Sequence, residues 1–507
     1  MPGVLDLTRV VGTAIPTARL VSLSAGKFAE ERAAAAYEAK DFEAMIGHLL
    51  EARRHGLNTV QVHMGLGTAY MKIGRNRESI QEYREAVRRG SRSVKLWNNL
   101  IFLLDLQPET TLETALEARK AWWRNFGAPL RSTWRKHPND PDPERPLRIG
   151  YVSGDFRRHS AAEAFSPVVL RHSEGYRAVC YSTCPDEDEI TALFEKEAAA
   201  FYRIEALDEA ALAERVRADG IDILVDLSGH SALNRLETFC RRPAPVQVTG
   251  WGYALGTGLP VMDGFFADEV TVPRAFAARG YVEPILWLPS VIPCTPMPYS
   301  DPVQPMPCLT RGYFTFGSFN RWAKITPLVL TTWAEILAAT PGSRLLLKEK
   351  AYEREDIRQQ VLAAMAAKGV AADRIEFRGW TPHVDHLRAY HEVDVALDPF
   401  PHSGGVTALE GLWHGVAPVN LLGDRVMERL SASFCHTLNL PAFVTTSRHE
   451  YITTAVLMAT QFQAQLADIR ASLQYRIAES PMCQGYVAAV ETHYRDLWRA
   501  WCRRSTA

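Results

Sequence analysis

This 507-residue sequence lacks paired cysteines and long apolar runs. Its eight cysteines are scattered and none forms a CxxC pair, which argues against a disulfide framework and against a zinc site. No window approaches the roughly 18 apolar residues that a membrane helix needs. The first twenty residues are interrupted by Arg9, Pro16 and Arg19, which makes them a poor secretory signal. These absences predict a cytoplasmic protein with reduced thiols and no membrane segment.

An excess of charge of either sign is also lacking, because 57 basic residues stand against 58 acidic ones and the formal net charge is −1. A balanced chain gives no electrostatic reason to expect nucleic acid or an anionic membrane as the main partner. Hydrophobic residues make up 47% of the chain and charged residues 23%, which is ordinary for a globular protein. At this length a single core is not expected, and about three domains are.

The first part of the chain has the periodicity of helices only. Tyr37 and Tyr70 lie 33 positions apart, and each is followed by a turn and an amphipathic stretch. Gly67 stands three positions before Tyr70, which is the small–aromatic pattern of a tetratricopeptide helix pair that repeats at about 34 residues. An ordinary helical bundle is the alternative, but the agreement of period and small-residue placement favours repeats. We predict an N-terminal segment at 1–26 and tetratricopeptide-like helices at 27–134.

After a linker rich in proline and aspartate, the pattern changes to short apolar strands that alternate with helices. This pattern is typical of parallel sheets covered by helices on both faces. It runs through 147–300, is interrupted by a second proline-rich stretch, and resumes through 308–485. The fold class is therefore α/β, with two Rossmann-like domains facing across a cleft and an amphipathic helix at 486–507 that crosses back onto the first. The expected strands are 147–153, 176–183, 221–229, 246–252 and 264–272, then 313–320, 343–350, 374–380, 393–400 and 417–423.

The segment 398–413 leads from the end of an expected strand into an expected helix. In parallel α/β sheets, ligands bind at the carboxyl ends of strands and against helix N-termini. Glycines at such a joint let backbone N–H groups approach a phosphate closely, and the helix adds about half a positive charge. The joint is a candidate diphosphate cradle, although a plain tight turn explains a glycine pair equally well. Glu410, one turn into the helix, could bind ribose hydroxyls. The joint itself consists of Ser403, Gly404, Gly405 and Val406.

Basic and histidine side chains follow other expected strands of the second block. Lysine and arginine beside a leaving diphosphate would stabilise the negative charge that builds as the sugar–phosphate bond breaks. Taken singly, each cation could instead form a surface ion pair, and a histidine could be a hydrogen-bonded core residue. The candidates are Asn320, Arg321, Lys324, Lys348, Trp380, His383 and His386.

The first block offers fewer candidates. His159 follows the first strand and is a possible general base for an acceptor hydroxyl, with Asp155 to cap or orient it. Asp226 and His230 stand at a later strand end. The acidic runs fall in the linker or in 185–189, where a solvated loop is the better interpretation, so we expect a charge-stabilised cleft without a metal.

Six segments, taken in order along the chain, resemble glycosyltransferase family 41, which holds the O-linked N-acetylglucosamine transferases and the SPINDLY-type proteins. They are LRIGYVSGDFRRHS, IDILVDLSGH, RRPAPVQVTGWGY, FNRWAKI, RIEFRGWTPHVDHL and DPFPHSGGVTALEGLWHGVAPV. The resemblance covers most of the chain. It implies a GT-B fold and an inverting, metal-independent transfer from a nucleotide sugar, UDP-N-acetylglucosamine first, to Ser or Thr of a protein. It implies no cofactor, and the repeats offer a short concave surface for an extended acceptor peptide.

The resemblance also implies roles for single residues. Lys324 corresponds to the family's diphosphate-contacting lysine, and His386 corresponds to its nucleotide-contacting histidine. Glu410 matches the acidic ribose contact, and His159 matches the histidine proposed as base. The phosphate turn corresponds to Gly404–Thr407. The expected substrate-binding set is Arg321, Lys348, His383, His386, Ser403, Gly404, Gly405, Val406, Thr407, Glu410, His230 and Tyr253.

The sequence departs from the family pattern at positions that bear on substrate choice. The loop after WGY has Ala254 and Leu255 where a proline and a small residue are usual, and it lies near the acceptor side. Arg321 replaces a neutral glutamine of the animal proteins, and Val406 stands where threonine is usual. GDP-fucose or another activated sugar therefore stays open as donor. Protein N-glucosylation, as in related members, also stays open.

The alternative to an enzyme is a non-catalytic interaction protein, in which the repeats form a scaffold on a degenerate transferase fold. The joint presence of Lys324, His386, the glycine turn and Glu410 argues against it. An enzyme acting on small molecules is disfavoured by the repeats, whose concave surface suits peptides.

Overall fold

The computed structural model describes residues 17–253, 255–295 and 301–506, so most of the expected segment 1–26, and Ala254, lie outside the described residues. Contacts within the chain divide it between Thr110 and Thr111 into two units. The boundary thus lies about 24 residues before position 134, where the helical region is predicted to end. The physical reason is helix α6 (Leu112–Trp122), which packs against α11 (Arg274–Gly280) of the second unit.

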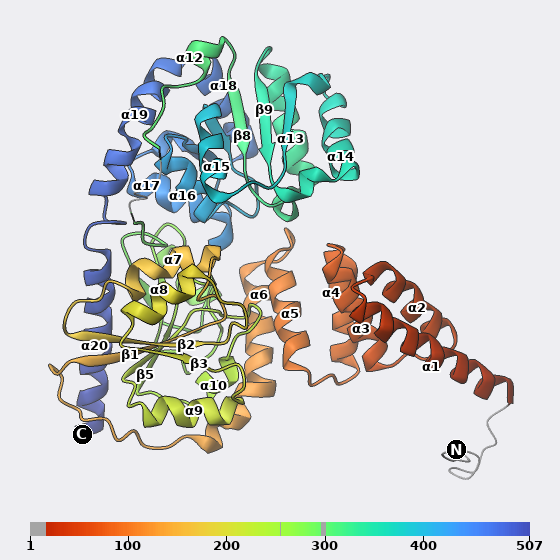
Figure 1. Ribbon diagram of the computed structural model, residues 1–507, viewed down its shortest axis with the longest axis vertical. Helices are drawn as coiled ribbons and strands as arrows, with labels where there is room; N and C mark the ends of the chain where they lie inside the picture. The colour runs from red at the N-terminus through yellow and green to blue at the C-terminus, as the bar shows by residue number, and fades with distance from the viewer. Residues whose placement is uncertain (1–16, 254, 296–300, 507) are drawn as a thin grey trace. The chain divides into compact units, whose positions relative to one another are not determined.

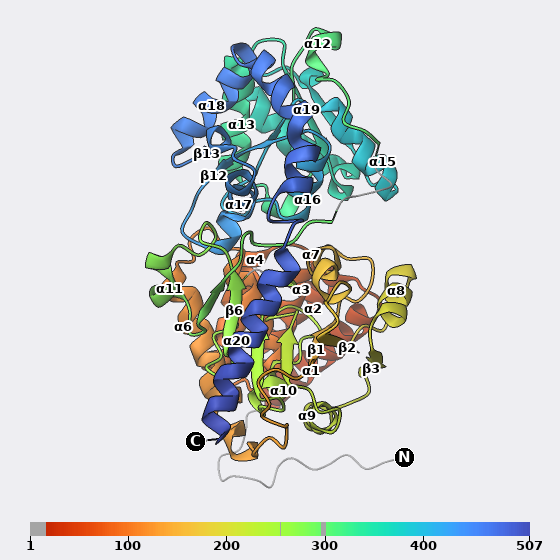
Figure 2. The same ribbon diagram turned by 90° about the vertical axis from the view of Figure 1, so that its left-hand side faces the viewer.

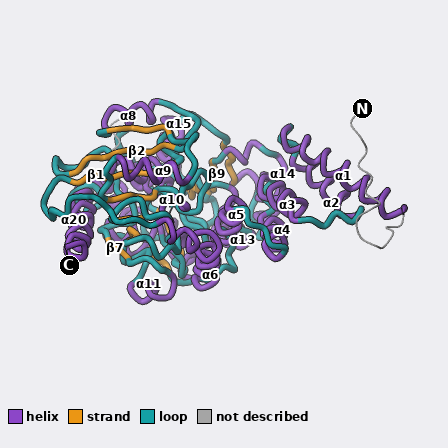
Figure 3. Tube along the Cα trace, turned by 90° about the horizontal axis from the view of Figure 1, so that it is seen from below, coloured by secondary structure: helices purple, strands orange, loops and turns teal. Residues whose placement is uncertain are grey.

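The first unit is built from helices and loops over its described residues (Figure 3). Helices α2 and α4 begin 34 positions apart, and so do α3 and α5. A Cβ atom added at Gly67 would lie 2.5 Å from the ring of Tyr83, so the helices approach too closely there for any larger residue. Period and close packing are both consistent with tetratricopeptide helix pairs. The helices are α1 (Thr17–Glu38), α2 (Phe42–Arg54), α3 (Val60–Lys72), α4 (Asn76–Arg88) and α5 (Val94–Asp105).

The second unit contains two parallel sheets with helices packed against them (Figure 1). The first sheet has the strand order β3-β2-β1-β4-β5-β6-β7. Its strands are β1 (Leu147–Ser153), β2 (Tyr176–Ser182), β3 (Ala200–Arg203), β4 (Ile223–Asp226), β5 (Val246–Thr249), β6 (Gly264–Ala267) and β7 (Ile285–Trp287). The helices between them are α7 (Ser160–Val169), α8 (Glu189–Glu197), α9 (Glu209–Ala218), α10 (Leu236–Cys240) and α11.

The second sheet repeats the same winding, with the order β10-β9-β8-β11-β12-β13. Its strands are β8 (Thr315–Ser318), β9 (Arg344–Lys348), β10 (Ile375–Arg378), β11 (Val395–Leu397), β12 (Pro418–Leu421) and β13 (Val444–Thr445). Its helices are α12 (Cys308–Arg311), α13 (Pro327–Ala339), α14 (Glu355–Ala366), α15 (His383–Arg388), α16 (Val406–Trp413), α17 (Leu430–Thr437), α18 (Arg448–Thr460) and α19 (Gln463–Glu479). The prediction of two parallel α/β domains is confirmed.

Three strands were not predicted from the sequence, and all three lie at sheet edges. They are β3 and β7 in the first sheet and β13 in the second. An edge strand is covered on fewer sides, so it does not need the continuous apolar run that marks a central strand. The four residues of β3, for example, are only partly buried or exposed.

The last helix, α20 (Tyr486–Thr506), returns to the first sheet (Figure 2). The indole N–H of Trp251 donates to the hydroxyl of Tyr486 at 3.0 Å, and the hydroxyls of Tyr151 and Tyr494 lie 3.2 Å apart. Tyr494 also packs edge-on against Phe266. One apolar cluster includes residues of both sheets and of α20, and a smaller cluster lies beside it. None of the described helices combines the length and apolar character needed to cross a membrane.

Candidate functional site

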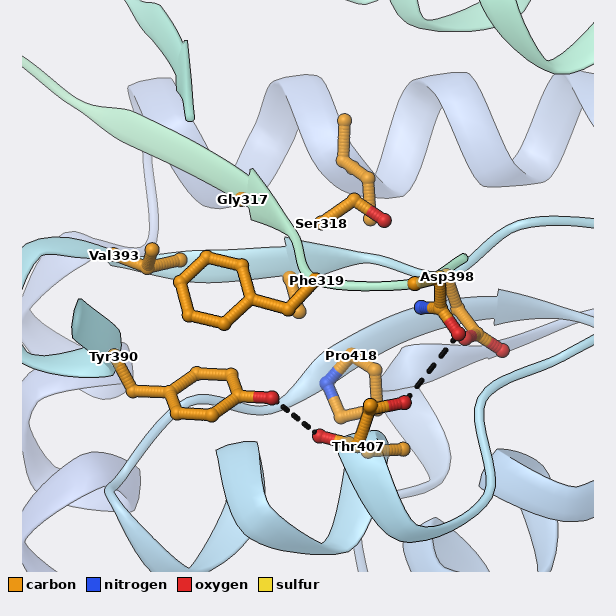
Figure 4. A pocket seen from close by; sticks show the side chains of 12 residues that line it. Gly317, Ser318, Phe319, Tyr390, Val393, Asp398, Thr407 and Pro418 are labelled. Atoms are coloured by element: carbon orange, nitrogen blue, oxygen red, sulfur yellow. Dashed lines mark hydrogen bonds between the residues drawn. The ribbon is translucent and has the colours of Figure 1, made fainter. Parts of the chain in front are cut away.

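The carboxyl ends of β8 and β11 meet at the N-terminus of α16, around a small cavity (Figure 4). The hydroxyl of Tyr390 donates to the carbonyl of Thr407 at 2.8 Å, and the hydroxyl of Thr407 donates to Asn320 at 3.4 Å. The cavity measures about 20 Å³, which is room for about one water molecule. A ligand larger than a water molecule does not fit inside this cavity.

Asp398, directly after β11, holds the glycine turn in place. Its carboxylate accepts the backbone N–H of Gly404 at 2.7 Å and the hydroxyl of Ser431. The side chain is 3% exposed, and burial raises the pKa of Asp398 to about 6, although the positive charge of Lys324 acts in the opposite direction. The carboxylate thus ties the turn to α17 and faces the lysine. Asp398 was not among the residues predicted for the site.

Ser403 fixes the turn from the other side. Its hydroxyl donates to the carbonyl of Met427 at 3.0 Å and accepts the backbone N–H of Leu430 at 3.0 Å. Its own N–H donates to the same Met427 carbonyl at 2.8 Å. The serine is therefore used in positioning the turn, and it is buried at 2% exposure.

The two glycines of the turn have different surroundings. A Cβ at Gly404 would lie 2.9 Å from Asp398 Oδ1 and 3.1 Å from the Cβ of Ala408, so this position needs glycine for packing within the protein. A Cβ at Gly405 would meet nothing nearer than 3.7 Å. Gly405 immediately precedes α16 and is its N-cap residue. Open space above a helix N-terminus is the arrangement that lets an anionic group approach the backbone.

Lys324 lies beside this turn, in a short 3-10 helix, Trp322–Lys324. Its ammonium group donates to the carbonyl of Ser403 at 2.8 Å and to Asn320 Oδ1 at 3.4 Å. Burial and, to a smaller extent, the charge of Arg321 lower the pKa of Lys324 to about 8, although the charge of Asp398 acts in the opposite direction. The turn therefore faces an ammonium group whose protonated form is only weakly favoured. A second anionic neighbour would favour that protonated form further.

His402, the residue before Ser403, was not among the residues predicted for the site. Burial and nearby positive charges, first that of Lys324, hold the pKa of His402 well below its ordinary value. The imidazole is accordingly neutral beside the cations of the turn. Its position next to Ser403 was the one signal in the sequence that could have drawn attention to it.

Glu410 forms a cluster with the two histidines of α15. Its carboxylate accepts from His383 Nε2 at 2.9 Å and lies 3.6 Å from His386 Nε2. Burial raises the pKa of Glu410, but the two histidines outweigh burial and hold it below the ordinary value. The hydrogen bond to Glu410 in turn raises the pKa of His383. The structure thus brings together three residues from two motifs that are separate in the sequence.

Lys348 and Trp380 are placed differently from the cations at the turn. The ammonium of Lys348 donates to the carbonyl of Gly379 at 3.0 Å and to the hydroxyl of Thr381 at 2.8 Å, and burial lowers its pKa. These bonds fix the loop that enters α15. Trp380 in the same loop is 69% exposed. Lys348 thus positions the loop that carries His383.

In the first sheet, His159 caps the N-terminus of α7. Its Nδ1 accepts the N–H of Ala161 at 3.2 Å and lies 3.5 Å from Asp155 Oδ1. Burial lowers the pKa of His159, Asp155 raises it, and the charge of Arg321 lowers it again. Because Arg321 lies in the loop after β8 of the second sheet and α7 contacts α16, this histidine faces the second domain. Similarly, burial and the charge of Glu410 raise the pKa of Glu163 on α7.

Asp226, His230 and Tyr253 lie in the interior of the first domain. His230 Nε2 donates to the carbonyl of Thr257 at 2.8 Å, its ring packs edge-on against Trp122, and burial lowers its pKa to about 3. Asp226 accepts the N–H groups of Ser228 and Gly229 and the hydroxyl of Thr249. The ring of Tyr253 packs against Gly229. For His230 these surroundings are those of a neutral, hydrogen-bonded core histidine.

Over the described residues, no group of three or more His, Cys, Asp or Glu side chains is arranged to hold a metal ion.

Comparisons with known proteins agree with this geometry. The model of Glycosyl transferase family 41 matches residues 130–293 and 308–490. The SPINDLY protein of Solanum lycopersicum, named a probable UDP-N-acetylglucosamine–peptide N-acetylglucosaminyltransferase, is 36% identical over 418 residues, 80% of this chain and 44% of the relative. The protein of the same name from Arabidopsis thaliana is 37% identical over 399 residues, 76% of this chain and 43% of the relative. The chain thus spans less than half the length of these curated relatives.

A solved structure gives the same result over nearly the whole chain. A mutant form of the O-GlcNAc transferase of Thermobaculum terrenum superimposes with a TM-score of 0.83 at 29% identity, covering 98% of this chain and 100% of the other. The expected resemblance and the expected GT-B architecture are both confirmed. Because the family model matches well over half of its residues, the chain belongs to glycosyl transferase family 41.

Proposed function

We propose that this protein is an inverting, metal-independent O-glycosyltransferase that moves N-acetylglucosamine from a UDP-sugar to a Ser or Thr hydroxyl of a protein. The observation that carries the proposal is the ammonium of Lys324, held 2.8 Å from the Ser403 carbonyl beside the open N-terminus of α16. Membership of family 41 and the names of the relatives support the donor class. In this proposal residues 308–485 bind the donor and residues 147–300 face the acceptor.

The donor would lie with its diphosphate on the backbone N–H groups of Gly405, Val406 and Thr407. The acceptor hydroxyl oxygen attacks the anomeric carbon from the face opposite the diphosphate, the bond from that carbon to the phosphate oxygen breaks, and UDP leaves with the electron pair. The proton of the acceptor hydroxyl is released through water to the solvent. Lys324 and Arg321 stabilise the charge that develops on the departing phosphate. Above the diphosphate, Glu410 would accept hydrogen bonds from the ribose hydroxyls, with His383 and His386 holding its carboxylate in place.

The geometry of His159 favours hydrogen-bond donation over proton abstraction. Because Nδ1 accepts the N–H of Ala161, the neutral ring carries its proton on Nε2. An Nε2–H group can bind a substrate oxygen but cannot take a proton at that atom. We therefore assign His159 a substrate-positioning role.

The helical unit α1–α5 is proposed to bind the acceptor polypeptide, because stacked helix pairs offer a concave surface to an extended chain.

A panel of nucleotide sugars tests the proposal. The full chain is incubated with a cell lysate and with UDP-N-acetylglucosamine, UDP-glucose or GDP-fucose, and modified proteins are detected by intact mass. We expect an added N-acetylhexosamine with the first donor. Transfer of fucose alone would move the assignment to GDP-fucose, the alternative that Arg321 and Val406 keep open. No added sugar from any donor, together with no thermal shift on adding UDP, would leave the scaffold hypothesis instead.

The affinity for UDP is expected to fall above pH 8. Free Lys324 has a pKa of about 8, and the bound diphosphate favours its charged form, so binding at higher pH must take up a proton. Each pH unit above this pKa then weakens binding by about tenfold, since one unit corresponds to about 1.4 kcal/mol. Calorimetric dissociation constants for UDP should therefore rise about tenfold between pH 7 and pH 9. Lys324→Arg, whose guanidinium stays charged, should lack this dependence; an equal dependence in both proteins would contradict the assignment.

A further inference from the structure

A second, larger cavity lies at the opposite end of the first sheet. It is lined by residues at the amino ends of three neighbouring strands: Arg148 in β1, Arg177 in β2 and Asp222 before β4. Its volume of about 560 Å³ is typical of a small-molecule site. The seven residues of β1 span about 20 Å, and His159 follows the other end of that strand. The cavity is therefore remote from the proposed donor site.

Several hydrogen bonds fix the segment that lines one side of this cavity. Arg145 binds Asp222 through two nitrogens, at 2.9 and 2.6 Å. The same carboxylate accepts the side-chain amide of Asn139 at 2.8 Å and the backbone N–H of Arg148 at 2.9 Å. Helix α20 holds the segment from outside, because the indole of Trp498 donates to the carbonyl of Asp142 at 2.9 Å. Arg145 and Asp222 thus neutralise each other and act as structure.

Two further arginines, Arg148 and Arg177, line the cavity without an acidic partner among the described residues. The guanidinium of Arg148 donates to the carbonyl of Asp219 at 2.7 Å, and within the described part of the chain Arg177 has no hydrogen bond or ion pair. Arg217 pairs with Glu214 at 2.9 Å, but its buried Nε has no partner among the described residues. Asp140 is the one other carboxylate in the lining. The cavity therefore contains two guanidinium groups, those of Arg148 and Arg177, that lack acidic partners within the described residues.

We propose that this cavity binds a small molecule that carries phosphate groups. Guanidinium groups present paired N–H donors that match phosphate oxygens, and arginine is favoured where such anions are recognised. A cavity of this size holds more than a single ion, which indicates a phosphorylated compound or a diphosphate. The proposal stands on the first sheet alone and does not depend on the donor site.

Pyrophosphate titrated into the full chain by calorimetry tests this site. The test variant is Arg148→Gln with Arg177→Gln, because these side chains do not support the wall as Arg145 does. The matched control is Arg84→Gln with Arg92→Gln, two exposed arginines of the helical unit with no hydrogen bond or ion pair to a described residue. We expect one class of pyrophosphate sites to weaken at least tenfold in the test variant and to be unchanged in the control.

Three further measurements make the result decisive. Binding of UDP and the melting temperature should be unchanged in the test variant, so that a loss there reports neither the donor site nor unfolding. Citrate should bind this site more weakly than pyrophosphate, and equal affinity would overturn the assignment to phosphate. A pyrophosphate isotherm that is the same in wild type and in the test variant would overturn the proposal, whether or not UDP binds.

Discussion

Replacing Lys324 with alanine is expected to lower kcat/KM for sugar transfer by about 100- to 1000-fold, the loss that follows removal of one well-placed group stabilising developing charge. In the proposed mechanism this ammonium faces the phosphate oxygen on which charge builds as the bond to the sugar breaks. The free protein holds Lys324 by two hydrogen bonds, to Ser403 and Asn320. Its substitution should therefore weaken binding of UDP and, in addition, lower the rate of transfer.

The fold should survive this substitution. Burial already disfavours the charged form of Lys324, so its removal also removes the cost of a desolvated charge. We expect a melting temperature equal to or above that of the wild type. Lys324→Arg serves as the control, because it keeps the charge but changes the shape and reach of the group, and it should recover binding of UDP better than it recovers transfer. Transfer at the wild-type rate by Lys324→Ala would exclude the proposed role.

The central part of the fold could be predicted because its strands are continuous apolar runs. The expected strand 147–153 coincides with β1, which is buried on both faces. The edge strand β13 escapes prediction because Val444 and Thr445 have no such pattern around them. The boundary between the two units, after Thr110, does not follow from local sequence patterns. It depends on the packing of α6 against α11, which are distant in sequence.

The site shows the same limit. Lys324, Gly404 and Glu410 stand in local motifs, so their approximate positions follow from the order of strands and helices. The surroundings of His230 do not, because its motif at a strand end looks like that of His159. The partner that places it in the interior, Trp122, belongs to a helix before the first sheet. The arginine-lined cavity was not predicted either, because its lining combines the linker before β1, the first residues of β1 and β2, and the segment from the end of α9 to Asp222, which are separate in the sequence.

Asp398 was not predicted as a site residue, because its partners Gly404 and Ser431 are set by the tertiary fold. We expect the stability of the glycine turn to depend most on this residue. Its carboxylate accepts from Gly404 and Ser431, and its carbonyl accepts the hydroxyl of Tyr451 at 2.9 Å. Only the carboxylate is lost in Asp398→Ala. Two donors in a buried region then lack an acceptor, at about 1–3 kcal/mol each, while relief of the buried carboxylate's own desolvation offsets part of this.

We therefore expect Asp398→Ala to destabilise the second unit, Thr111–Ala507, by about 3 kcal/mol, which lowers its melting temperature by about 4 °C. Ser431→Ala is the matched control: it removes one of the two hydrogen bonds, leaves Gly404 held, and should cost about 1 kcal/mol. Loss of Asp398 also removes a negative charge that favours protonated Lys324, so the lysine should lose its proton at a lower pH. Transfer should then fall even at temperatures where the variant is folded, whereas Ser431→Ala should retain it. Equal melting temperatures for Asp398→Ala and the wild type would show that the turn is held by Ser403 and its partners alone.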